Sequence, residues 1–272
     1  MQKMQKHNEL VLAGTVAACV TILVSRLVDL ALFTDPQTSF VTIGPAWTRY
    51  AVPAVLAVLM DQFSHMGAVA HPAALRGKCG RLGGWLLAAG AAFALGGLLA
   101  VPSLFTAYGI NLVVAVLDCV LPVVLAMGLV LFGLRALSPE NGAEPLPHFA
   151  TALLPVGYLI WAAIRLFFVA PASVLRLSCT MRVLSVCGAL MFTIALLRVF
   201  LAPRQPYGES LYASGMAAFL LCTCCELPQA VFELFWGTGT IHGFVLSLGM
   251  GLYGVCGLVC GIAAAGKEAP EE

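Results

Sequence analysis

Long apolar runs separated by short polar breaks dominate the chain. Each run is about 20 residues, the length that an α-helix needs to cross roughly 30 Å of hydrocarbon at about 1.5 Å per residue. The short alternating segments typical of a transmembrane β-barrel do not occur in the sequence, so helices must satisfy the backbone in lipid. The runs cover residues 10–33, 44–61, 82–105, 111–134, 148–170, 174–201, 208–235 and 241–265. We therefore predict an all-α, polytopic transmembrane helix bundle of about eight spans, which forms a single membrane-embedded domain over residues 1–272.

Lysine and arginine are confined to alternate breaks between the runs. Cytoplasmic loops of membrane proteins keep positive charge, so this alternation predicts that the N- and C-termini are both cytoplasmic. We expect a multi-pass protein of a bacterial-type cytoplasmic membrane. The positive breaks and their flanks hold Lys3, Lys6, Arg76, Lys78, Arg81, Arg135, Arg198, Arg204 and Lys267, whereas the other set has neither residue type until Arg176.

The composition supports a protein whose first partner is the lipid bilayer. Hydrophobic residues make up 61% of the chain and charged residues 10%, with a mean hydropathy of +0.97. Soluble domains carry roughly 25% charged residues. The net charge of +1 provides no basic surface for nucleic acid, which we exclude as a partner. The ten cysteines lie inside apolar runs except Cys79, so we interpret them as packing residues rather than disulfides.

Ionisable residues inside the runs fall between the middle of the membrane and its outer edge. A buried charge costs about 2.5 to 3.5 kcal/mol on insertion scales, so these side chains should face one another or water. Helical spacing supports inward-facing stripes, because Arg26 and Asp29 share a face, as do Glu226 and Glu233. Tyr158, Trp161 and Arg165 also lie along one side of a single run. The candidate binding residues are Arg26, Asp29, Arg49, Asp118, Tyr158, Trp161, Arg165, Arg182, Glu226 and Glu233.

Prolines interrupt three of the runs beside these charges. Pro53 frees the carbonyl of Arg49, and Pro122 frees that of Asp118. Pro228 lies two residues after Glu226. Opened helices at membrane depth are tolerated where they line a cavity. The pattern predicts an outward-facing polar pocket between the first, second, fourth, fifth, sixth and seventh runs.

Three functions fit this pocket. In a small-solute transporter or ligand-binding membrane protein, Arg165 and Arg182 would attract an anionic or zwitterionic solute, and Asp118 and Glu226 would couple a proton or cation. In an intramembrane enzyme, the arginines would hold the head group of a lipid or isoprenoid. In a sensor or scaffold subunit, the charges would only be structural ion pairs. We favour the first hypothesis.

Two other features of the sequence concern metals and assembly. His242 is the only histidine at the outer side, so we expect no metal and no cofactor. Small residues form a stripe in the third run, at Gly83, Gly90 and Gly97, and in the last, from Ser247 to Gly261. Such stripes suit close helix packing, either within the bundle or in a homo-oligomer.

Overall fold

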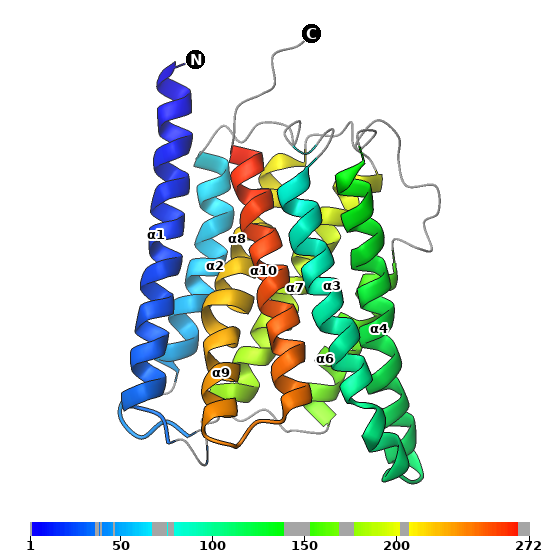
Figure 1. The fold of residues 1–272 in the computed structure, drawn as a ribbon. Helices are drawn as coiled ribbons and strands as arrows, with labels where there is room; N and C mark the ends of the chain where they lie inside the picture. Colours follow the sequence, from blue (N-terminus) through cyan, green and yellow to red (C-terminus); the bar gives the residue numbers. More distant parts are fainter. Residues whose placement is uncertain are drawn as a thin grey trace.

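The protein is an all-helical bundle whose long helices run roughly side by side (Figure 1). The computed structural model describes residues 2–35, 38, 40–45, 47–66, 75, 79–138, 153–168, 177–201 and 207–265. Within these ranges no sheet is present, and the one extended pairing is an isolated bridge between Thr34 and Val41. The prediction of an all-α bundle is therefore confirmed.

Each predicted run corresponds to one helix or one continuous helical segment. The single helices are α1 (Gln2–Leu32), α2 (Thr48–Met66), α3 (Gly80–Leu99), α4 (Ile110–Leu137), α6 (Leu154–Phe168), α7 (Leu177–Leu201) and α10 (Ile241–Ala265). The seventh run is α8 (Gly208–Ala218), a π-helical segment η3 (Phe219–Glu226) and α9 (Leu227–Phe235) in succession. A short 3-10 turn, η2 (Val101–Phe105), follows α3.

Six helical segments within the described ranges are long and apolar enough to cross a membrane, which is consistent with a multi-pass membrane protein. They are Glu9–Leu32, Gly80–Phe105, Ile110–Leu137, Thr180–Leu201, Gly208–Phe235 and Ile241–Ala265. This number differs from the expected eight because α2 and α6 do not qualify. The apolar part of α6 is short, at Leu154–Leu166, and α2 is not among the six segments.

The helix ends follow the alternation expected from the lysines and arginines. The start of α1 and the end of α10 lie at the same end of the bundle (Figure 1). Arg81 at the start of α3, Arg135 at the end of α4 and Arg198 at the end of α7 belong to that end as well. Arg76, Lys78, Arg176, Arg204 and Lys267 lie outside the described residues.

Apolar side chains fill the centre of the bundle and also cover its outside. Inside, the rings of Phe132 and Phe200 stack at 5.2 Å, and Phe192 packs against Tyr253 at 5.1 Å. Outside, large apolar residues are exposed along α1 and α2, for example Val24 and Val55. A surface of this kind suits contact with lipid rather than water.

The glycine stripes are used for packing within the chain. A Cβ atom on Gly97 of α3 would lie 2.7 Å from the carbonyl oxygen of Cys119 in α4, and one on Gly90 would lie 3.2 Å from that of Ala126. On α10, Gly257 faces the backbone of Gly215 in α8. Only glycine permits this approach of two helix backbones. Both stripes already face helices of the same chain. Self-association through them stays a prediction.

The α3–α4 contact gives a test of this packing. Replacing Gly97 with Ala should lower stability by about 1 to 3 kcal/mol, since the added methyl would lie too close to the backbone of Cys119 and to the side chain of Val123. Gly84 is the matched control on the same helix, where a Cβ would meet nothing within 4 Å. Thermal unfolding of both variants in detergent measures the effect. Equal melting temperatures for the two variants would contradict the close packing.

Candidate functional site

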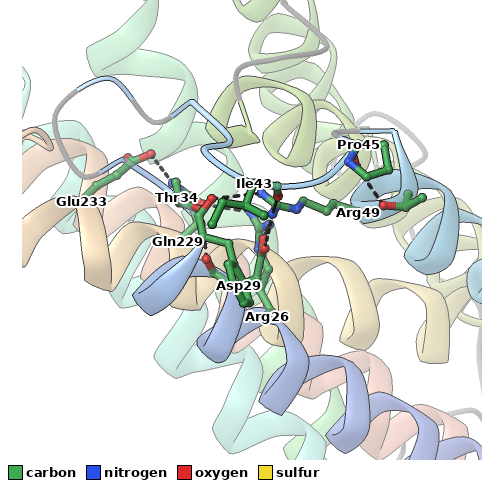
Figure 2. Close-up of polar contacts among 10 residues, drawn as sticks. Arg26, Asp29, Thr34, Ile43, Pro45, Arg49, Gln229 and Glu233 are labelled. Carbon is green, nitrogen blue, oxygen red and sulfur yellow. Dashed lines mark hydrogen bonds and ion pairs between the residues drawn. The ribbon is translucent and has the colours of Figure 1, made fainter.

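The expected layer of charge divides into two adjoining groups of side chains. One group joins α1, α2 and α9, and it contains Arg26, Asp29, Arg49 and Gln229 (Figure 2). The other surrounds a cavity between α4, α6, α7, η3 and α10. The two groups differ in how accessible their arginine side chains are: Arg26 and Arg49 are 4% and 13% exposed, whereas Arg165 and Arg182 are 36% and 33% exposed.

In the first group, Asp29 is the shared partner of two arginines. Its carboxylate lies 3.3 Å from Nη1 of Arg26 and 3.0 Å from Nη2 of Arg49. Arg49 also donates to the carbonyl oxygens of Phe33, at 3.4 Å, and Ile43, at 2.7 Å. Arg49 therefore fastens the connection between α1 and α2 to the end of the bundle, as Figure 2 shows.

Gln229 connects this group to the second one. Its side-chain oxygen accepts a hydrogen bond of 2.8 Å from Nη2 of Arg26, and its Nε2 donates at 3.0 Å to Glu233. Glu233 in turn pairs with Nη2 of Arg182 at 2.5 Å. A continuous line of polar contacts thus runs from α2 through α1 and α9 to α7. Gln229 was absent from the sequence-based candidates, although it shares a helical face with Glu226 and Glu233.

The second group lines a cavity of about 330 Å³. Six of the ten sequence-based candidates contribute to its wall: Asp118, Tyr158, Trp161, Arg165, Arg182 and Glu226. The remaining wall is mainly apolar and includes Val186, Leu246 and Met250. Arg165 lies near the end of α6 and His242 at the start of α10, so the cavity belongs to the end of the bundle opposite the chain termini.

The expectation of one pocket shared by all ten candidates is corrected by the structure. Four candidates do not line this cavity: Arg26, Asp29, Arg49 and Glu233. The first and second runs were expected to form part of its wall. Instead, α1 packs against η3 and α9. Arg26 pairs with Asp29 and donates a hydrogen bond to Gln229. The last run, which was not expected to form part of the wall, supplies His242 and Ser247 to the cavity.

Asp118 organises one side of the cavity. Its carboxylate accepts a hydrogen bond of 3.0 Å from Nε1 of Trp161 and pairs with Nη2 of Arg165 at 2.9 Å. Trp161 and Arg165 lie one turn apart on α6, so a single carboxylate on α4 holds both. Pro122 lies one turn after Asp118 inside α4 and also lines the cavity.

Glu226 forms the other side and is almost fully buried, with 4% of its surface exposed. It is the last residue of the π-helical segment η3, and such segments are frequent at functional sites. Ser247 of α10 donates to its Oε1 at 2.9 Å, and Ser185 of α7 donates to its Oε2. The carboxylate is thus held by hydroxyl groups from two neighbouring helices, without a direct ion pair among the described residues.

Two polar atoms of the cavity residues remain without a partner. Nε of Arg165 and Nε2 of His242 are buried and make no hydrogen bond within the described part of the chain. A buried polar group left unpaired costs about 1 to 3 kcal/mol. A ligand with acceptor oxygens in the cavity would satisfy the Arg165 donor and, if the histidine carries its proton on Nε2, the second one too.

The charges that line the cavity cancel. Arg165 and Arg182 are balanced by Asp118 and Glu226. About one third of each arginine side chain is accessible, 36% for Arg165 and 33% for Arg182. The cavity therefore presents both signs of charge to an occupant without an excess of either.

Comparisons with family models, with curated proteins and with solved structures found no match, so only this geometry bears on function.

The Arg165–Asp118 pair can be tested by a double-mutant cycle. Arg165→Gln and Asp118→Asn should each destabilise the protein, because each leaves one charge without its partner. The double variant should recover part of the loss, with a coupling of about 1 kcal/mol, in the lower part of the range for contacting residues because Arg165 is partly exposed. Thermal stability of the four proteins in detergent gives the coupling, and strictly additive effects would exclude it.

Proposed function

We propose that the protein binds a small zwitterionic solute in the cavity around Asp118, Arg165 and Glu226 and carries it across the membrane. The observation that supports this proposal best is the cancelling of charge in the lining. A site with two cations and no anions would favour an anion. A lining that has no net charge but holds separate positive and negative groups matches a solute that is itself neutral and carries both charges.

The size of the cavity limits the solute. Its volume of about 330 Å³ is near the lower end of the roughly 300 to 1,000 Å³ typical of ligand sites. An amino-acid-sized molecule is suited to this space. A complete lipid head group with its glycerol is less well suited, and for this reason we prefer a transporter or solute-binding protein to an enzyme that acts on lipids.

The wall suggests how such a solute would lie. Its carboxylate would accept hydrogen bonds from the unpaired Nε of Arg165 and from His242. Its ammonium group would approach Glu226, whose two oxygens already accept from Ser185 and Ser247. An apolar substituent would contact Leu246 and Met250.

Glu226 is also our candidate for coupling to a proton or cation. It is a buried carboxylate beside the cavity, and intramembrane acidic groups of this kind form proton relays in pumps and transporters. The π-helical turn that ends at Glu226 and Pro122 in α4 interrupt the regular hydrogen bonding of two cavity helices. These are the points where the wall could rearrange during transport.

The structural-pair hypothesis applies to the other group of charges. The carboxylate of Asp29 serves Arg26 and Arg49, and Glu233 serves Arg182 and Gln229. We propose that this group fixes α1 and α2 against α9 and takes no part in binding the solute.

Solute binding can be measured with purified protein in detergent. We expect neutral amino acids to raise the melting temperature, and their decarboxylated or deaminated analogues to do so at least tenfold less potently. Glu226→Gln and Arg165→Gln should each remove the effect. Arg198→Gln, at the far end of α7, is the control and should leave it intact. Stronger stabilisation by simple monocarboxylates would favour an anion site instead.

The proposed topology has eight crossings with both termini in the cytoplasm. A membrane-impermeant thiol reagent should label a cysteine introduced at Thr106, between η2 and α4, in intact cells. Native Cys79, which precedes α3 at the opposite end of the bundle, should react only after permeabilisation. The reverse pattern would invert the orientation, and labelling of both sites in intact cells would contradict the eight crossings.

A further inference from the structure

A second hollow lies between α1 and α2, apart from the proposed solute cavity. Its volume is about 250 Å³, and its polar wall consists of Ser25, Arg26, Asp29, Thr48 and Arg49. Thr48 and Arg49 open α2, and Asp29 lies in the last turn of α1. The hollow therefore lies near the end of the two helices, at the level of the head groups if these helices cross the bilayer.

The wall of this hollow carries one positive charge in excess. Arg26 and Arg49 share the single carboxylate of Asp29. The next partner of Arg26 is Gln229, which is neutral, and Glu233 does not line the hollow. An uncompensated charge in a low-dielectric setting is costly, so the hollow is suited to an anion.

Arg26 also has a donor to spare. Its side chain is only 4% exposed, and Nε makes no hydrogen bond to any described residue. The hydroxyl of Ser25 lies on the same wall. An oxyanion placed here would accept from a buried guanidinium and would neutralise its charge, which is the arrangement that arginine forms with phosphate.

The surroundings of the hollow identify the source of the anion. Valines on both helices are exposed beside it: Val24 and Val28 are 54% and 45% exposed on α1, and Val52 and Val55 are 50% and 56% exposed on α2. Farther along the same two helices, Cys19 and Met60 belong to one buried cluster with Tyr212 and Met216 of α8, whereas the hollow lies open near the helix ends. An anion with acyl chains fits this combination of a charged recess and apolar flanks.

We propose that the hollow between α1 and α2 binds the phosphodiester head group of an anionic phospholipid. The phosphate lies against Arg26 and Arg49, and the acyl chains follow the exposed valines. The lipid thereby fills the space that the two helices leave open and fastens them to the bundle. This site is independent of the solute proposed above, and its test requires no transport.

The experiment compares phosphatidylglycerol with phosphatidylcholine of the same acyl chains, by native mass spectrometry of the whole protein in detergent. We expect roughly fivefold tighter binding of phosphatidylglycerol, the factor that about 1 kcal/mol per basic residue implies. Arg26→Gln should remove the preference. Because this change also breaks the contact with Gln229, Val52→Trp serves as a second variant that fills the hollow from an exposed position.

The matched control is Val58→Trp, which places the same side chain at a position 67% exposed on the same helix but away from the hollow. It should keep the preference for phosphatidylglycerol. Equal affinity of the native protein for both lipids, or a preference that persists in Val52→Trp, would overturn the proposal. Displacement of phosphatidylglycerol by inorganic phosphate at equal concentration would assign the site to a soluble anion and reject the lipid.

Discussion

The pairing of charge inside an apolar bundle is the constraint on which the rest of the arrangement depends. Each ion removed from water costs several kcal/mol, so it must find a partner on another helix or on its own. In this protein, carboxylates are the groups that bind several partners at once. Asp29 holds two arginines, and Asp118 holds Arg165 and Trp161. Because Arg49 lies on α2 and Arg165 and Trp161 lie on α6, these contacts tie α1 to α2 and α4 to α6.

The same constraint distinguishes a structural lock from a site. In the first group, two arginines share the carboxylate of Asp29, and the polar contacts continue from Arg26 through Gln229 to Glu233. Around the cavity the arginines keep about one third of their side chain accessible, against 4% for Arg26 and 13% for Arg49. Helix α10 approaches α8 closely, with Gly257 against Gly215, and Ser247 of the same helix reaches Glu226 beside the cavity. Close packing at one end therefore positions polar groups at the other.

Much of this could be predicted from residue types and spacing. Apolar runs of membrane length located the helices, most closely for α10, whose bounds agree with the run 241–265, and least closely for α1, which begins at Gln2 rather than at residue 10. The three-residue spacing of Arg26 and Asp29 predicted a shared face, and the two do pair. Neither result needs long-range information, because hydrophobic length and helical periodicity are local properties of a chain.

What only the tertiary structure decided is the choice of partners. The sequence by itself determined that the chain is helical and apolar enough for a membrane. It did not reveal that Arg26 bonds Gln229, which lies on a helix distant along the chain, or that His242 and Ser247 line the cavity. It also gave no sign of the π-helical turn before Glu226. A side chain's depth follows from its own helix, whereas its partner depends on the rotation and packing of every neighbouring helix.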